Sequence, residues 1–395
     1  MIRWVYTIYK FSYQNGLLIE FSEKQKLMID SKNIKIPPKM NAIVTHAHSD
    51  HFAVMNSISP TYATQETIDL FYTQKQGSSR NENLIPTKFN EEIKFAENNI
   101  DGKISLIPSG HVLGSSSVVV DKNGHRLLFS GDIGGKGQLT ITTPLEKIKA
   151  EILVVEATFG SPQISFPSRE DISMEILKWT ADVVKQKKNV LFSAGKMGSA
   201  QELIKIFNNL TTLRVVTHGE VSQISNVYKK YGVNLEYFDS KSDEGREILK
   251  DGEAVIIQPR GKKIVPYFLT EYVECKTAIV TGMASRFTYR NYDASFPLSS
   301  HANFHEIIEY ISDVSPEMVF TIYGLEKKLA EAITKELEIP AIPLKFKDKA
   351  INKIDSTIPN PPLEEKIERR LPKKINNNIK TNKKEFTLDD FFTDQ

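Results

Sequence analysis

The sequence predicts a mixed α/β protein, in which a β-rich N-terminal part precedes a part where strands and helices alternate. Three observations support this prediction. Short apolar runs between turn residues dominate residues 1–160. After about residue 162, apolar positions recur with helical spacing between short apolar strands. The 395 residues correspond to two or three domains at about 150 residues each, and 40% hydrophobic residues can build a sizeable core.

Strands in the N-terminal part are predicted at residues 17–21, 26–30, 42–45, 104–107, 117–121, 126–130 and 152–156. Glycines fall in the gaps between strands, where turns are expected: Gly16, Gly102, Gly110 and Gly124. Residues 1–21 mix aromatic and basic side chains, and they lack the continuous apolar core and the cleavage site of a signal peptide. They are therefore expected to form the first strands of the fold.

The rest of the chain alternates in the manner of a parallel sheet. Amphipathic helices are predicted at residues 172–185, 199–209, 221–231, 302–313 and 326–337. Short apolar strands are predicted between them, at residues 189–193, 213–217, 254–258, 278–281 and 318–323. Such alternation favours parallel α/β units.

The near balance of acidic and basic residues excludes a protein that binds nucleic acid through an overall positive charge. Lys and Arg total 51 against 49 Asp and Glu, so any nucleic-acid binding has to use local patches. Cys275 is the single cysteine, which excludes a disulfide framework or a cysteine-based zinc site and favours the reducing cytoplasm. No apolar run approaches the ~20 residues that cross a bilayer, so no membrane association is predicted.

The strongest chemical signal is the segment Thr45-His46-Ala-His48-Ser-Asp50-His51, which comes directly after the predicted strand at residues 42–45. The chain has 8 histidines, and three of them lie in this loop. A surface loop that is rich in histidine by chance explains this spacing poorly. Imidazole and carboxylate are the ligands that zinc takes in proteins when thiolates are absent.

Two further candidate ligands follow other predicted strands. His111 comes after the strand at residues 104–107, and Asp132 comes after the strand at residues 126–130. Alone, either residue could be structural, because a single histidine and a Gly-Asp turn are common. Together with the histidine loop, each adds a ligand from a neighbouring strand end, so the sequence predicts one metal centre.

The order of these motifs, H-x-H-x-D-H followed by a distant His and a distant Asp, resembles the metallo-β-lactamase fold hydrolases. The resemblance implies an αββα sandwich and a site for two zinc ions. By this resemblance, the first ion is held by His46, His48 and His111, the second by Asp50 and His51, and Asp132 bridges them. Paired cations favour hydroxide near neutral pH and neutralise charge on a phosphoryl group. Asp50 would also accept the proton of the nucleophile.

Three later motifs resemble the β-CASP nucleases, in which an α/β cap domain is inserted into that fold. They are Glu156-Ala-Thr158-Phe159, the segment at residues 190–203 and Ser-Ser-His301-Ala. The resemblance covers residues 15–345 and implies cleavage of nucleic acid between the two domains. It assigns residues 1–165 and 291–350 to the metallo-β-lactamase domain and residues 166–290 to the cap. His301 would act as general acid or bind a phosphate oxygen, and Glu156 would orient it.

Two features bear on the substrate. Lys196, Gly198 and Ser199 lie in a loop at a predicted helix N-terminus, which would offer backbone N–H groups to a phosphate. Tyr323 stands where ribonucleolytic members carry a metal-binding histidine, and tyrosine is a poor zinc ligand because its pKa is about 10. The second zinc would then be held weakly unless His305 compensates. The departure favours DNA, since Artemis-like members also lack that histidine, and Tyr323 becomes a candidate substrate contact.

The C-terminal residues 359–395 change in composition. Closely spaced prolines are followed by residues 373–384, which are rich in lysine and contain no acid, so a disordered linker is predicted. The segment at residues 385–392 resembles the peptide that binds the sliding clamp PCNA, with candidate contacts at Glu385, Leu388, Phe391 and Phe392. Glutamate replaces the usual glutamine at its first position. A tail that folds back onto its own core is the alternative.

The sequence therefore predicts a zinc-dependent nuclease, expected to be an exonuclease, that hydrolyses DNA phosphodiester bonds in repair or replication and is recruited by a sliding clamp. An RNA-processing ribonuclease of the same fold is the first alternative. The second is an inactive subunit that binds nucleic acid and the clamp, and the intact ligand set argues against it.

Overall fold

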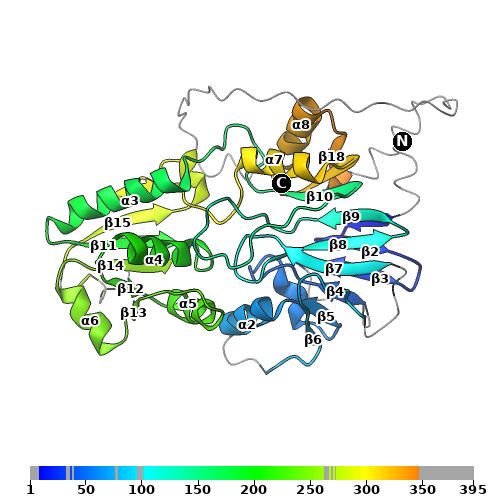
Figure 1. Cartoon of the computed structure of the whole chain (residues 1–395). Coiled ribbons are helices and arrows are strands. Elements are labelled where there is room, and N and C mark those ends of the chain that lie inside the picture. Colours follow the sequence, from blue (N-terminus) through cyan, green and yellow to red (C-terminus); the bar gives the residue numbers. More distant parts are fainter. Residues whose placement is uncertain are drawn as a thin grey trace.

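The computed structural model describes residues 9–32, 36–37, 40–75, 79–95, 100, 102–261, 267, 270–271 and 273–346. These residues form three sheets of six strands each, with helices on their faces (Figure 1). The predicted α/β class is confirmed. The predicted linker and clamp-binding peptide, within residues 359–395, lie outside the described residues.

The first two sheets come from the two ends of the described chain. The first has the order β1-β2-β3-β4-β5-β6, with bounds Lys10–Tyr13, Leu17–Glu20, Lys26–Ile29, Asn41–Ile43, Thr61–Ala63 and Leu84–Pro86. The second has the order β18-β17-β10-β9-β8-β7, with bounds Ala341–Pro343, Met318–Gly324, Ile152–Ala157, His125–Phe129, Ser116–Lys122 and Lys103–Pro108. In each sheet, three antiparallel strands that are consecutive in the chain continue into parallel strands.

The two sheets pack face to face, because each strand directs alternate apolar residues into the space between them. Phe11 of β1 and Phe320 of β17 meet there edge to face, with ring centroids 5.0 Å apart. The outer faces are covered by η1 (Phe52–Asn56) and α2 (Gln65–Gln74) on the first sheet and by α7 (Phe304–Val314) and α8 (Glu326–Leu337) on the second. Strand β10 is buried along its whole length because both of its faces are covered. These layers form the predicted αββα sandwich.

The third sheet lies beside the sandwich and is parallel throughout (Figure 1). Its order is β13-β12-β14-β11-β15-β16, with bounds Phe238–Asp239, Val215–Thr217, Val255–Pro259, Asn189–Ala194, Cys275–Val280 and Ala294–Phe296. One face is covered by α3 (Arg169–Val184), α4 (Ser199–Leu210) and α5 (Glu220–Lys230), and the other by α6 (Asp243–Lys250). Because β16 pairs with β15, this unit extends past the cap boundary predicted at residue 290.

The third sheet and the sandwich share one hydrophobic cluster. Ala47, Leu70, Val112 and Leu113 of the sandwich belong to the same cluster as the apolar faces of α3, α4 and α5. The Tyr228 hydroxyl on α5 accepts a hydrogen bond from the Leu113 N–H at 3.2 Å. Ala47 and Val112 are sequence neighbours of predicted metal ligands, so the third unit packs directly against the predicted site.

Several short elements escape the sequence prediction. Strands β5, β6, β13, β16 and β18 contain only two or three residues, too few to show an alternating pattern. Helices α2 and α6 were also missed, and α6 is polar over most of its 8 residues. Among the described helices, none is long and apolar enough to span a bilayer.

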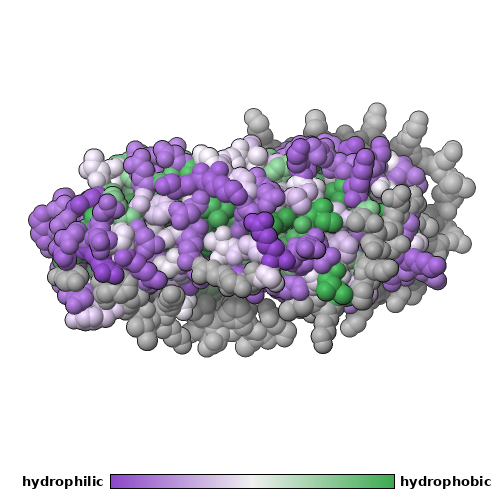
Figure 2. All heavy atoms as spheres, turned by 90° about the horizontal axis from the view of Figure 1, so that it is seen from below, coloured by the Kyte–Doolittle hydropathy of each residue, from purple (hydrophilic) through white to green (hydrophobic). Residues whose placement is uncertain are grey.

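The surface seen in Figure 2 is largely hydrophilic, with hydrophobic side chains gathered in small areas. Large exposed hydrophobic side chains of the described part are Ile58, Leu139, Met174, Leu210 and Tyr267. They are far apart in the sequence, and this pattern is ordinary for a protein surface.

Candidate metal centre

The loop that follows β4 carries His46, His48, Asp50 and His51. Main-chain hydrogen bonds fix the position at which this loop begins. The Val44 N–H donates to the Tyr62 carbonyl at 3.0 Å, and the Thr45 carbonyl accepts from the Ser116 N–H at 2.9 Å. The loop therefore leaves the edge where both sheets of the sandwich end, and η1 begins directly after it.

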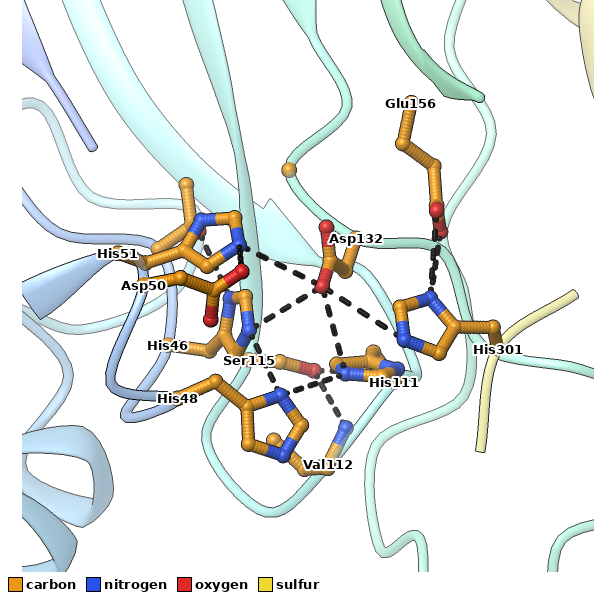
Figure 3. Close-up of polar contacts among 12 residues, drawn as sticks. His46, His48, Asp50, His51, His111, Val112, Ser115, Asp132, Glu156 and His301 are labelled. Carbon is orange, nitrogen blue, oxygen red and sulfur yellow. Dashed lines mark hydrogen bonds and ion pairs between the residues drawn. The ribbon is translucent and has the colours of Figure 1, made fainter. Parts of the chain in front are cut away.

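Three imidazoles and one carboxylate converge on a single point (Figure 3). His48 Nδ1 lies 3.0 Å from His46 Nε2 and 3.1 Å from His111 Nε2. Asp132 Oδ2 lies 3.3 Å from His46 Nε2 and 3.6 Å from His111 Nε2. Ligands at the usual zinc bond lengths of about 2.0–2.1 Å in a tetrahedron stand about 3.3 Å apart. The spacing of the four atoms therefore fits a tetrahedral divalent ion.

The protonation of these histidines also fits a metal centre. Burial, followed by the charges of neighbouring imidazoles, lowers the pKa of His46 and of His48 to about 3. The same causes hold the pKa of His111 well below its ordinary value. At neutral pH all three imidazoles are thus uncharged, and each presents a nitrogen lone pair, which is the form that binds metal.

A second group of ligands lies on the other side of Asp132. His51 Nε2 is 3.6 Å from Asp132 Oδ2 and 3.6 Å from Asp50 Oδ2. Asp132 thus stands between the two groups, as a bridging ligand would. The Asp50 side chain is 60% exposed and faces solvent, whereas His51 is buried. Burial alone would lower the pKa of His51, but the Asp132 and Asp30 carboxylates outweigh it and raise the pKa to about 10.

Asp30 is a member of the site that sequence reasoning missed. Its carboxylate is fully buried at the end of β3 and accepts from the Thr45 N–H at 2.8 Å and the Thr45 hydroxyl at 2.6 Å. Its Oδ2 lies 3.0 Å from His51 Nδ1, on the opposite side of the ring from Asp132. Such a carboxylate fixes the ring orientation and tautomer of a metal-binding histidine. The signal available in the sequence was an acid at the end of the strand predicted beside the histidine loop.

Glu156 and His301 form the remaining wall of the site (Figure 3). Both Glu156 oxygens lie 3.2 Å from His301 Nδ1, and Glu156 Oε1 also accepts from the Ile133 N–H at 2.6 Å. His301 Nε2 faces Asp132 Oδ2 at 3.9 Å. Burial disfavours the charge on His301, but Glu156 and Asp132 outweigh it and raise the pKa to about 9. These two carboxylates therefore favour the protonated form of the His301 ring.

Tyr323 packs against the second ligand group without offering it a deprotonated oxygen. Its ring meets the His51 ring edge to face, with centroids 5.1 Å apart, and its hydroxyl lies 3.5 Å from the Asp30 carbonyl. Burial and nearby carboxylates hold the pKa of the phenol well above its ordinary value, so the oxygen stays protonated. His305 is exposed on α7 and belongs to none of the candidate ligand groups of the described residues.

The residues predicted to cradle a phosphate, Lys196, Gly198 and Ser199, lie at the start of α4. The structure already engages two of them. The Lys196 ammonium is 2.7 Å from Glu220, and the Gly198 N–H donates to the Gln201 side chain at 2.8 Å. Gly198 has a φ of +88°, and a Cβ there would lie 2.9 Å from the Ser300 hydroxyl. The glycine thus permits the close approach of α4 to the segment that carries His301, and Ser199 is buried beside it.

A family model described as the metallo-beta-lactamase superfamily matches residues 13–218 of the chain. The chain therefore belongs to the metallo-β-lactamase superfamily, and the resemblance predicted from the histidine motif is confirmed.

Individual relatives indicate which members of the superfamily the chain resembles. The chain is 25% identical over 307 residues to a protein named "Probable DNA ligase" from Opitutus terrae, covering 75% of this chain and 28% of that protein. It is 26% identical over 211 residues to an "RNase J-like protein" from Methanocaldococcus jannaschii, covering about half of each chain (48% and 49%). It is 24% identical over 393 residues to "RNase aCSPSF2" from Saccharolobus solfataricus, covering 82% and 77%. These relatives support the resemblance to the β-CASP nucleases.

A solved structure shows the same fold. The crystal structure of a protein of unknown function from Enterococcus faecalis aligns with a TM-score of 0.55 over 81% of this chain and 95% of that chain, at 12% identity. The alignment extends well beyond residues 13–218, so it includes parts of the chain that the family model leaves unmatched.

Proposed function

We propose that this chain is a metal-dependent nuclease that hydrolyses phosphodiester bonds of nucleic acid. The observation that carries the proposal is the arrangement around Asp132, whose carboxylate faces two groups of metal ligands and also the Glu156–His301 pair. Two-metal sites with a nearby proton donor suit in-line displacement at phosphorus. The relatives named as ribonucleases and as a DNA ligase support nucleic acid as the substrate class.

The donor set fits divalent ions, and we propose zinc. Neutral imidazoles and carboxylates without thiolates, with four atoms at tetrahedral spacing, match the preferences of zinc. One ion would be held by His46, His48, His111 and Asp132, and a second by Asp50, His51 and Asp132. Such ions, when bound, acidify water and neutralise charge on the phosphoryl group.

The protein's own residues would move the two protons of hydrolysis. Asp50 is ionised, because the charged His51 ring outweighs the partial desolvation of the Asp50 carboxylate and lowers its pKa, so this carboxylate would accept a proton from the attacking water. His301 would donate its Nε2 proton to the leaving oxygen as the phosphorus–oxygen bond breaks. Glu156 would hold the Nδ1–H of His301 and so keep Nε2 directed at the reaction. The ring then returns to the protonated form by taking a proton from solvent.

DNA is the proposed substrate, and an exonuclease the proposed mode. By the sequence resemblance to the β-CASP nucleases, Tyr323 stands where ribonucleolytic members carry a histidine, and one relative carries the name of a DNA ligase. RNA is the second candidate, and the relatives named RNase J-like and RNase aCSPSF2 favour it. The observations thus support a nuclease more strongly than they support either substrate.

One assay separates these possibilities. Chelator-treated protein is supplied with zinc, manganese or magnesium and incubated with end-labelled single-stranded DNA, double-stranded DNA and RNA of matched sequence. Metal-dependent cleavage of DNA in preference to RNA supports the proposal, and the ladder of products distinguishes stepwise removal of nucleotides from internal cuts. Absence of cleavage with every metal and substrate would refute the nuclease assignment.

Recruitment by a sliding clamp is proposed for residues 385–392. The support is the sequence pattern alone, because these residues lie outside the described part of the chain. A tether of lysine-rich chain would raise the effective concentration of the enzyme near clamp-bound DNA.

A further inference from the structure

Gln138 joins the backbone segments that carry two of the site histidines. Its Nε2 donates to the Gly110 carbonyl at 2.6 Å and lies 3.2 Å from the Ser300 carbonyl. Gly110 directly precedes His111, and Ser300 directly precedes His301. The orientation of the amide follows from its partners, because only its NH₂ end can donate to two carbonyl oxygens.

The two segments meet through the backbone of Gly134 and Gly135, because the Gly134 N–H donates to the Ser109 carbonyl at 2.9 Å and the Gly135 N–H donates to the Ser300 carbonyl at 3.2 Å. Their relative position is therefore sensitive to small changes. The rings of His111 and His301 have centroids 4.2 Å apart at 49°. Gly134 pairs with His301 in an isolated bridge, and a Cβ on Gly134 would lie 1.8 Å from the Gly110 carbonyl oxygen. A separation of these segments would move the proposed proton donor relative to a proposed metal ligand.

A buried ion pair holds the loop that carries Gln138, with one contact before Gln138 in the sequence and one after it. Glu202 of α4 accepts from the Thr140 N–H at 2.8 Å, and Arg169 of α3 donates to the Lys136 carbonyl at 3.1 Å. Arg169 and Glu202 are 3.3 Å apart, and the Glu202 side chain is fully buried. Since both helices belong to the third unit, this unit presents Gln138 to the metal-bearing sandwich.

We propose that Gln138 is a positioning residue that sets His301 against the metal centre, and that Arg169 and Glu202 hold it in place. This inference rests on the proposed nuclease function, in which His301 donates a proton to the leaving oxygen. Gln138→Glu tests it, because the side chain keeps its size but a carboxylate then faces two carbonyl oxygens. Gln138→Met removes the donor without adding charge, and it replaces the first variant if that one does not fold.

The leaving group of the substrate reveals whether His301 is displaced. A nucleotide leaves as an alkoxide that needs a proton, whereas 4-nitrophenolate leaves without one. Gln138→Glu should lower kcat on an oligonucleotide about 10–100-fold, since general acid catalysis contributes about 10²–10⁴-fold. Hydrolysis of bis(4-nitrophenyl) phosphate should fall much less, with metal content unchanged. Gln186→Glu is the matched control, because the exposed Gln186 amide also donates to a backbone carbonyl, at 2.9 Å, but beyond the C-terminal end of α3.

A double variant separates positioning from general damage. If Gln138 acts through His301, the loss caused by Gln138→Glu on the oligonucleotide should nearly disappear in a His301→Ala background. If the losses caused by Gln138→Glu and by His301→Ala multiply in the double variant, the proposal is overturned. It is also overturned if Gln138→Glu loses equal activity on the oligonucleotide and on bis(4-nitrophenyl) phosphate.

Hydrogen exchange supplies a readout that needs no activity. The Gly135 N–H donates to the Ser300 carbonyl at 3.2 Å, and the Ala302 N–H donates to the Ile133 carbonyl at 2.7 Å. Both amides should exchange faster in Gln138→Glu than in the wild type, while those of Gln186→Glu should not. If the wild type cleaves nothing, the nuclease assignment fails, and unchanged exchange in Gln138→Glu would refute the positioning role by itself.

Discussion

Replacing Asp30 by asparagine should weaken the site while leaving its backbone intact. Asp30 has a φ of +51°, a left-handed conformation that asparagine adopts as readily as aspartate, so the change isolates the hydrogen bonds. One Asp30 oxygen accepts from the Thr45 N–H at 2.8 Å, and the other lies 3.0 Å from His51 Nδ1. In either orientation of the amide, its NH₂ group faces one of these donors. One buried donor therefore loses its acceptor.

The expected cost follows from the charge and burial of Asp30. A hydrogen bond to a charged group contributes about 1.5–3 kcal/mol, so the metal-free variant should lose about that much free energy of unfolding. Loss of the carboxylate behind a metal-binding histidine typically costs about 10–100-fold in metal affinity, and the site that contains His51 should weaken by that factor.

Two measurements check the expectation. Urea denaturation of the chelator-treated protein gives the free energy of unfolding, and competition with a chromophoric chelator gives the metal affinity. Asp182→Asn, an exposed change on α3, is the control and should alter neither quantity. An Asp30→Asn protein with wild-type stability and wild-type metal affinity would refute the assigned role of this carboxylate.

Three further predictions concern the metals and the tail. Asp132→Asn should lower metal content and abolish hydrolysis with little loss of fold, because Asp132 faces both ligand groups; full activity with unchanged metal content would contradict the assignment. The wild type should retain fewer than two metal ions per chain after dialysis, and Tyr323→His should raise this number; two tightly held ions in the wild type, measured by elemental analysis, would show that Tyr323 does not limit the second site. Replacing Phe391 and Phe392 by alanine should remove most of the affinity for the sliding clamp, since each buried ring contributes about 1.5–3 kcal/mol, and should spare hydrolysis of short oligonucleotides; calorimetry that detects no clamp binding by the wild type would end the recruitment hypothesis.

The metal ligands could be predicted because their signal is local. His46, His48 and His51 share one loop directly after a strand, and no packing requirement explains three imidazoles there. The longer helices were predicted for a similar reason, since each buries an apolar stripe that repeats with helical spacing. The loop that contains Lys196, Gly198 and Ser199 was harder to interpret. The sequence suggested free backbone N–H groups there, but the Gly198 N–H donates to the Gln201 side chain, and the glycine is needed for the close approach of Ser300.

The residues that support the metal ligands could not be predicted from their residue types. Asp30 is an acid at a strand end, as many surface acids are, and only the sheet pairing of β3 with β4 brings it beside Thr45. Gln138 contacts two backbone carbonyls, which any residue could supply, so its partners leave no trace in the sequence. Supporting contacts of this kind depend on the tertiary arrangement of segments and not on residue pattern.

The two sides of the site depend differently on the rest of the fold. The proposed metal ligands lie between His46 and Asp132, in loops that follow N-terminal strands of the sandwich. Glu156 and His301, in contrast, are 145 residues apart, and the chain between them builds the whole third sheet. If those residues were flexible, bringing Glu156 and His301 together would cost conformational entropy. The folded third unit avoids this cost, because it fixes the position of the His301 segment, which follows β16, relative to the end of β10. Loss of stability in the third unit should therefore impair proton donation before it impairs metal binding.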